Sequence, residues 1–247
     1  MGSRSSRLMS IKKITYADMF MQSLADNGYT HCFFLAGGNS MHLLEAASNV
    51  FTCVPFTHEV SATIAAEYFT ESSITKAFAL VTAGPGLTNA ITAIAGAWLE
   101  SRELLVVGGQ VKSTDLKTPD MRQGGIQEID GVSLCQPITK VSKRIDDSMT
   151  RDEISSLVQK GRAGRKGPVF LEVPLDVSGK VIDTEQLEQS KQIHSPERPE
   201  TQNLDSKIRQ QMGALIEKSN RPLILIGQGT SKADAAKIAQ SMAKIGV

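Results

Sequence analysis

The sequence predicts an α/β fold: a doubly wound, mostly parallel sheet with helices on both faces, followed by a truncated second α/β unit. Two observations support this prediction. Short apolar runs of strand length alternate with longer segments of helical periodicity from residue 15 to residue 173, as in successive βαβ units. Glycine-rich turns follow several of these runs, as tight connections from strand to helix require.

The first part of the chain supplies alternating helices and strands. Apolar residues at helical spacing predict a helix over residues 15–27, which Gly28 ends. Short apolar runs bounded by turn residues predict strands, and these are expected at 31–35, 50–56 and 77–81. The helices that follow them are expected at 41–48, 60–70 and 87–99.

The second part continues this pattern and then changes. A strand is expected at 104–108, a helix at 154–165 and a strand at 169–173, closed by Pro174. A polar stretch with Pro196 and Pro199 predicts a linker. After it come a predicted helix over 204–218, a strand with a glycine turn in "RPLILIGQG" (221–229) and a helix over 232–245.

These elements predict a division into domains. We expect a disordered or tag-like tail at 1–13, a first domain at 14–176, a linker at 177–203 and the beginning of a second domain at 204–247. The last segment is too short for an independent α/β core. We therefore expect this unit to be cut off or to be completed by another chain.

Composition and charge argue against several classes of protein. The formal net charge of +1 gives no support for a nucleic-acid or membrane surface, and no apolar run reaches the length of a membrane span. The N-terminal residues lack the apolar region of a secretory signal. Cys32, Cys53 and Cys135 have no metal-binding spacing and are expected to be reduced thiols of a cytoplasmic protein.

Several glycines and one glutamate fall where predicted strands end. Gly37 and Gly38 follow one strand, Glu59 follows the next, and Gly84 and Gly86 follow a third. Parallel α/β sheets bind ligands beyond the carboxyl ends of their strands, so we expect these positions to line one cleft. Two alternatives stay open: a glutamate in the first turn of a helix also complements the helix dipole, and glycines also permit a tight turn.

Other catalytic motifs receive little support. His58 could act as a general base, but a lone histidine more often has a structural role. The chain has no Walker lysine motif, no G-x-G-x-x-G dinucleotide fingerprint and no G-x-S-x-G elbow. His31, His42 and His194 form no cluster in the sequence that suggests a metal site.

Taken in order, several segments resemble a known family. They are "LAGGNSMHLLEA", "THEVSATIAAEYF", "FALVTAGPGLTNAITAIAGAWLES", "LLVVGGQV", "GIQEIDGVSLCQPITK" and "GPVFLEVPLDV". They resemble the N-terminal, pyrimidine-binding domain of thiamine-diphosphate enzymes of the acetolactate synthase type, over residues 15–176. The segment from residue 204 resembles the start of that family's central domain.

The resemblance implies a role for several residues. The glutamate of "HE", here Glu59, hydrogen-bonds N1′ of the aminopyrimidine and favours the imino tautomer, whose nitrogen takes the proton from C2 of the thiazolium. Gly38 matches the position whose backbone lies beside the aminopyrimidine and the reacting carbon. Thr82, Pro85 and Asn89 match cofactor-lining positions. Gln127 matches the glutamine that faces the thiazolium and the substrate.

The resemblance also implies an activity and an assembly. We expect the chain to be part of a 2-keto-acid decarboxylase or carboligase, a transferase or lyase with pyruvate as the donor. Ala36, Leu35, Ile126 and the pair Val60-Ser61 depart from the family pattern, so the acceptor stays open. The family joins the pyrimidine-binding domain of one subunit to the diphosphate-binding domain of another, which implies a homodimer or tetramer.

The metal site of the family has no counterpart here. The family binds Mg²⁺ and the diphosphate at a G-D-G…N-N motif in a C-terminal domain, and this sequence contains no such motif. We therefore expect this chain alone to lack the metal site and to be inactive. FAD, which some relatives bind, has no support in the sequence. The alternatives are one subunit of a split enzyme and a non-catalytic binding domain that kept the fold.

Overall fold

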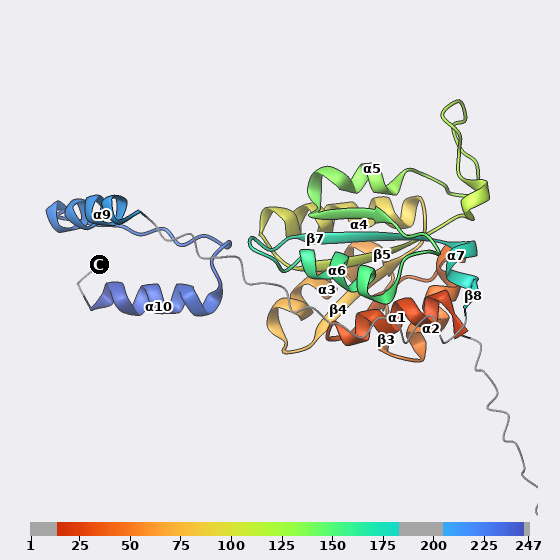
Figure 1. Ribbon diagram of the computed structural model, residues 1–247, viewed down its shortest axis with the longest axis horizontal. Helices are drawn as coiled ribbons and strands as arrows, with labels where there is room; N and C mark the ends of the chain where they lie inside the picture. The colour runs from red at the N-terminus through yellow and green to blue at the C-terminus, as the bar shows by residue number, and fades with distance from the viewer. Residues whose placement is uncertain (1–13, 183–204, 245–247) are drawn as a thin grey trace, which may run out of the picture.

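A six-stranded parallel sheet forms the centre of the part of the protein between residues 14 and 182 (Figure 1). The computed structural model describes residues 14–182 and 205–244. All five strand pairings in this sheet are parallel, which confirms the predicted fold class. In spatial order the strands are β3 (Thr52–Pro55), β2 (Tyr29–Phe34), β4 (Lys76–Val81), β5 (Leu104–Gln110), β7 (Pro168–Pro174) and β6 (Val141–Arg144).

The strand order reverses between β2 and β4. From β2 the chain moves outward to β3 at the edge of the sheet, and then returns past β2 to β4. The connections that leave these strands therefore diverge at their carboxyl ends. In open α/β sheets this switch point is the usual place of a ligand crevice.

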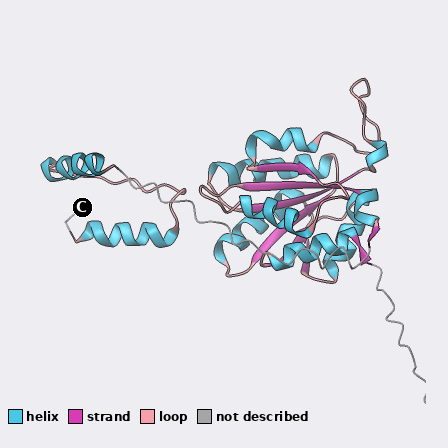
Figure 2. Cartoon of the chain, viewed as in Figure 1, coloured by secondary structure: helices cyan, strands magenta, loops and turns pink. Residues whose placement is uncertain are grey.

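Helices cover both faces of the sheet (Figure 2). One face packs against α1 (Tyr16–Asp26), α2 (Met41–Ser48), α6 (Arg151–Lys160) and α7 (Leu175–Gly179), and the other against α3 (Glu59–Ser72), α4 (Pro85–Leu99) and α5 (Gly131–Cys135). The side chains of β4 alternate between the two cores: Phe78 and Leu80 face α1, whereas Ala77 and Ala79 face α3 and α4. This period of two is the geometry of a strand buried on both faces.

Local signals explain where the helices begin and end. The side chain of Thr15 caps α1 and pairs with Asp18 in a capping box, and Gly28 follows the helix with a φ of 87°. Thr150 and Glu153 form a second capping box at α6. The bounds of α2 agree with those expected from the sequence, although its N-cap residue, Ser40, makes no side-chain capping hydrogen bond.

Some elements were not expected. The edge strand β6 was missed because its sequence, Val-Ser-Lys-Arg, is short and mostly polar. The antiparallel pair of β1 (Ile14–Thr15) and β8 (Val181–Ile182) depends on a contact between distant segments. The short helices α5 and α7 and the 3-10 turns η1 (Gly38–Ser40), η2 (Ser113–Asp115) and η3 (Gln136–Ile138) were also not expected.

The C-terminal segment forms its two helices but not its strand. The helices are α9 (Ser206–Lys218) and α10 (Lys232–Ala243). The strand expected in 221–229 is wrong, because residues 222–227 are neither helix nor strand, and Leu223 and Leu225 are 82% and 88% exposed. An extended segment becomes a strand only when a neighbour satisfies its backbone groups, and no strand in the described residues pairs with it.

The predicted division into domains stays a prediction. Packed elements continue past residue 176 through α7 and β8 to Ile182. The expected tail at 1–13 and most of the expected linker at 177–203 lie outside the described residues.

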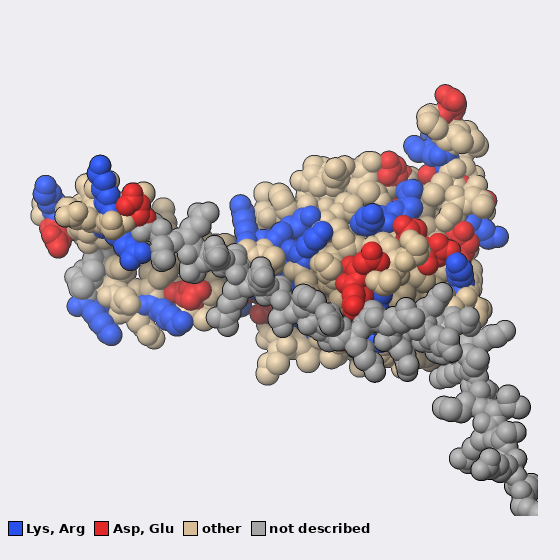
Figure 3. All heavy atoms as spheres, viewed as in Figure 1, with Lys and Arg blue, Asp and Glu red and all other residues tan. Residues whose placement is uncertain are grey.

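The surface mixes charges of both signs. On the face shown in Figure 3, basic and acidic side chains are interspersed over the described residues, in keeping with a net charge of +1. None of the helices in the described residues is long and apolar enough to span a membrane.

Candidate functional site

The loops that follow β2, β3 and β4 meet at the carboxyl edge of the sheet. A Cβ atom added at Gly37, after β2, would lie 2.4 Å from Cβ of Thr82, after β4. A Cβ atom added at Gly86 would lie 3.5 Å from Oε1 of Glu59, which follows β3. The strand-end residues therefore surround one site at the switch point of the sheet, as their positions in the sequence predict.

Glu59 is the first residue of α3 and is only 7% exposed. His58 caps the N-terminus of this helix: its Nδ1 atom accepts a hydrogen bond from the Val60 amide at 3.3 Å. This cap gives His58 a structural role at the helix terminus. It also fixes the direction in which Glu59 leaves the backbone.

The two oxygens of the Glu59 carboxylate have different surroundings. Nδ2 of Asn89, on α4, donates a hydrogen bond to Oε2 at 2.9 Å. Among the described residues no donor reaches Oε1, which faces the backbone of Gly86. Oε1 therefore keeps its hydrogen-bonding capacity for a ligand. The hydrogen bond between Asn89 and Glu59 joins residues 30 positions apart in the sequence.

Thr82 adds an unpaired polar atom beside this carboxylate. Its Oγ1 atom is buried and has no hydrogen-bond partner among the described residues. A Cβ atom at Gly37 would lie 2.6 Å from this oxygen, and one at Gly86 would lie 2.8 Å from Cγ2 of Thr82. Buried hydroxyls without a partner are uncommon, so a ligand with a polar group at this point would complete the site.

Gln127 is brought to the same edge by its backbone. A Cβ atom at Gly84, where φ is 64°, would lie 2.4 Å from the carbonyl oxygen of Gln127. Gln127 itself has a φ of 63°, a conformation that is uncommon for residues other than glycine. Nδ2 of Asn39 donates to the carbonyl of Ile126 at 3.3 Å. The loop with Gln127 thus lies against both glycine turns.

The remaining predicted residues border the site, and in the described part of the chain none of them forms a hydrogen bond with the Glu59 carboxylate. Pro85 is the first residue of α4 and is exposed, which suits a proline because its missing N–H is not needed there. Gly38 is exposed, and open space surrounds the position of its Cβ atom. The structure thus gathers Glu59, Thr82 and Asn89 tightly and leaves Gly38, Pro85 and Gln127 at the rim; their roles stay predictions.

Some residues at this edge were not singled out from the sequence. Asn39 holds the loop of Gln127, and Gln110 and Glu172 lie under its continuation. Glu172 sits in the middle of the apolar run "VFLEVP", and a charged residue inside a buried strand was the signal that could have identified it.

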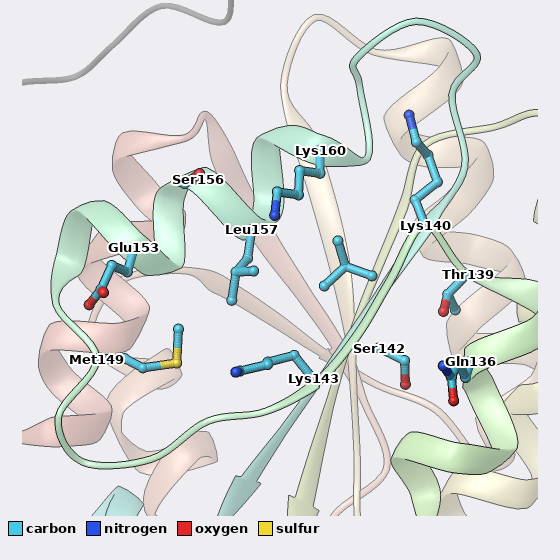
Figure 4. A pocket seen from close by; sticks show the side chains of 11 residues that line it. Gln136, Thr139, Lys140, Ser142, Lys143, Met149, Glu153, Ser156, Leu157 and Lys160 are labelled. Atoms are coloured by element: carbon cyan, nitrogen blue, oxygen red, sulfur yellow. The ribbon is translucent and has the colours of Figure 1, made fainter.

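A cavity elsewhere holds none of the predicted site residues. It has a volume of about 590 Å³ and lies between β6 and α6 (Figure 4). Several of its polar side chains already serve the fold: Lys140 donates to the carbonyls of Ala163 and Arg165, and Glu153 completes the capping box of α6. No group of three or more His, Cys, Asp or Glu residues in the described part of the chain could hold a metal ion.

Comparison with known proteins gives an independent line of evidence. Residues 14–134 match the family model of the thiamine pyrophosphate enzyme, N-terminal TPP binding domain. The acetolactate synthase of Arthrospira platensis is 30% identical over 94% of this chain and 40% of its own length, and the acetolactate synthase large subunit of Lactococcus lactis is 29% identical over 92% and 39%. The 2-hydroxyacyl-CoA lyase 2 of Mus musculus is 36% identical over 62% of this chain and 24% of its own length. The chain thus spans about two fifths of the acetolactate synthases that it matches.

Proposed function

Residues 14–134 belong to the N-terminal domains of the thiamine pyrophosphate enzymes, and from this premise we propose that Glu59, Thr82 and Asn89 hold the aminopyrimidine end of thiamine diphosphate. The observation that carries the proposal is the carboxylate of Glu59, with Oε2 bonded to Asn89 and Oε1 without a donor in the described residues, near the unpaired hydroxyl of Thr82.

The chemistry of these groups suits an aminopyrimidine. Such a ring offers a basic nitrogen and an amino group, and it has flat faces. A protonated carboxyl oxygen donates a hydrogen bond to the nitrogen, a hydroxyl pairs with a polar edge, and glycine backbone permits close approach to a face. The Gly37 and Gly86 positions supply that backbone beside Thr82.

Asn89 decides which oxygen of Glu59 carries a proton. Its Nδ2 atom donates to Oε2, and an oxygen that accepts such a bond is a poor place for a proton. A proton shared with a ring nitrogen is therefore held at Oε1. Low exposure keeps water from competing for it. When bound, the cofactor supplies an electron sink for the carbanion of a 2-keto acid.

We propose a 2-keto acid as the substrate, with pyruvate as the donor, in a decarboxylase or carboligase. The acetolactate synthases among the relatives support this reaction class. The exposed rim at Gly38, Pro85 and Gln127 supports completion of the site by a diphosphate-binding domain with Mg²⁺, supplied by another chain in a homodimer or tetramer.

Binding of the aminopyrimidine can be tested on this chain. Saturation-transfer NMR with thiamine diphosphate and Mg²⁺ is expected to give stronger transfer to the pyrimidine protons than to the thiazolium protons. Glu59→Gln is expected to remove most of this difference. Glu45 is an exposed carboxylate on α2, and Glu45→Gln is expected to preserve the difference. Equal transfer to both rings, or an unchanged pattern in Glu59→Gln, would overturn the proposal.

A further inference from the structure

Three side chains on adjacent strands, two of them buried, form a hydrogen-bonded network next to the candidate site. Arg144 on β6 donates to Oε2 of Glu172 on β7 at 2.7 Å, and Gln110 on β5 donates from Nε2 to Oε1 of Glu172 at 3.0 Å. Gln110 is fully buried and Glu172 is 1% exposed. Burial of a carboxylate is costly unless it is paired and hydrogen-bonded, so this arrangement needs a reason beyond packing.

The hydrogen bonds of Gln110 extend this network to the loop that carries Gln127. Nε2 of Gln110 also donates to the carbonyl of Ile129 at 2.9 Å, and Oε1 of Gln110 accepts from the Val111 amide at 2.9 Å. The amide of Gln110 thus joins the end of β5 to a loop 19 residues further along the chain. Both polar atoms of the side chain are used.

The loop lies directly on this network. A Cβ atom at Gly131 would lie 2.6 Å from Oε1 of Glu172 and 2.4 Å from Cδ2 of Leu87. At its other end the loop is closed by Glu128, whose Oε2 atom accepts from the Gly124 amide at 3.1 Å. Gln127 lies between Gly124 and Gly131, with its carbonyl against Gly84.

We propose that Gln110 is a positioning residue, which holds the carbonyl of Ile129 through a side chain oriented by Glu172 and Arg144, and thereby fixes Gln127 against the Gly84 turn. This inference rests on the proposed function, because only that function makes Gln127 a residue that faces the substrate. The placement of the loop itself is a property of the chain without any cofactor.

The positive φ of Gln127 explains why the loop needs a hydrogen bond that holds it in place. A residue other than glycine in this conformation is strained, and a loop of mostly exposed residues provides little packing to hold it. The bond from Gln110 reaches the loop two residues after Gln127. Loss of this bond is expected to free the backbone while the strands below stay paired.

Amide hydrogen exchange on the full chain, read by peptide mass spectrometry, tests the proposal without a ligand. Gln110→Met keeps the length of the side chain but removes its donor and acceptor. Exchange across residues 124–131 is expected to accelerate by about tenfold, the factor for one lost hydrogen bond. Exchange in α1 and α6, on the opposite face of the sheet, is expected to keep its wild-type rate.

A second buried amide provides the matched control. Nδ2 of Asn27 donates to the Ser23 carbonyl at 2.8 Å and to Oγ of Ser155 at 2.9 Å, which joins α1 to α6. Asn27→Leu is expected to accelerate exchange in those helices and not in 124–131. Glu172→Gln keeps an acceptor for Gln110 and is expected to accelerate the loop by less than Gln110→Met.

The outcomes separate this proposal from the proposed function. Unchanged exchange in 124–131 of Gln110→Met, or equal acceleration of every peptide, would overturn the positioning role even if thiamine diphosphate binds. Loop-specific acceleration would support it even if thiamine diphosphate does not bind.

Discussion

Nδ2 of Asn89, on α4, donates a hydrogen bond of 2.9 Å to Oε2 of Glu59, the first residue of α3. The two helices begin after β3 and β4, so the bond joins the connections that leave these two strands. It orients a mostly buried carboxylate and leaves Oε1 for a ligand. The first two predictions below concern this pair.

Glu59→Gln is expected to leave the fold intact and to remove proton transfer. The free energy of unfolding should change by no more than about 1 kcal/mol, the typical scale for a point mutant. Gln keeps the size of Glu but holds no acidic proton at Oε1, so exchange of the C2 proton of bound thiamine diphosphate should slow by about 10²–10⁴-fold. NMR measures this exchange in the chain supplied with a diphosphate-binding half. A folded, cofactor-bound variant with the wild-type rate would reduce Glu59 to a carboxylate that complements the helix dipole.

Asn89→Leu is expected to lower stability as well as cofactor binding. The substitution leaves Oε2 of Glu59 without its donor in a site of low exposure, which costs about 1–3 kcal/mol. Urea unfolding at neutral pH measures this loss. Asn49 has an exposed amide at the end of α2. Asn49→Leu is therefore the control for an Asn-to-Leu change away from the site, and it should change stability by less than about 0.5 kcal/mol. Equal stabilities of the two variants would contradict the prediction.

Adjacent glycines after β2 give a matched pair of variants. A Cβ atom in Gly37→Ala would lie 2.4–2.6 Å from three side-chain atoms of Thr82, whereas one in Gly38→Ala would meet nothing within 4 Å. Gly37→Ala should therefore destabilise the protein by about 1–3 kcal/mol, as overpacking does. Gly38→Ala should keep its stability within about 0.5 kcal/mol and weaken thiamine diphosphate binding, because Gly38 is predicted to line the cofactor. Thermal unfolding and NMR titration measure the two effects, and the reverse order of stabilities would refute the assignment.

Glu172→Gln is expected to change how stability depends on pH. Burial raises the pKa of Glu172, and its bonds from Arg144 and Gln110 offset this only in part. A carboxyl with a raised pKa in the folded state contributes stability below its unfolded pKa and loses it as the pH rises through the folded value. Above the ordinary pKa of a glutamate, the wild type should therefore lose stability with rising pH more steeply than the variant.

The other groups that face Glu172 define the control for this measurement. Asp130 and Arg144 affect its pKa, and the pKa of Cys135 is raised to about 12 by burial and by Glu172. All three are present in both proteins, so the difference between the two stability curves reports Glu172 together with its interactions with these groups. Chemical unfolding at a series of pH values measures the curves. Parallel curves would show that Glu172 titrates alike in the folded and unfolded states.

The sequence by itself determined the class of the fold and the end of the sheet at which the site lies. Apolar runs, the Thr15 capping box and glycine stop signals act between residues a few positions apart, so they are legible without the structure. The same reasoning placed Glu59 and the glycine turns at strand ends, which a parallel sheet brings to one edge. It failed at β6, whose polar strand exists only because β7 pairs with it, and at 222–227, where no described strand offers such a partner.

Only the tertiary structure decided which of these residues touch one another. The bond from Asn89 to Glu59 spans 30 residues and that from Gln110 to Glu172 spans 62, and such pairings follow from strand order and register. Packing also made Gly37 rather than Gly38 the glycine that Thr82 requires. Local propensity carries no information on distances between segments far apart in the chain; these distances arise when buried polar groups find partners and side chains fill the space between the layers.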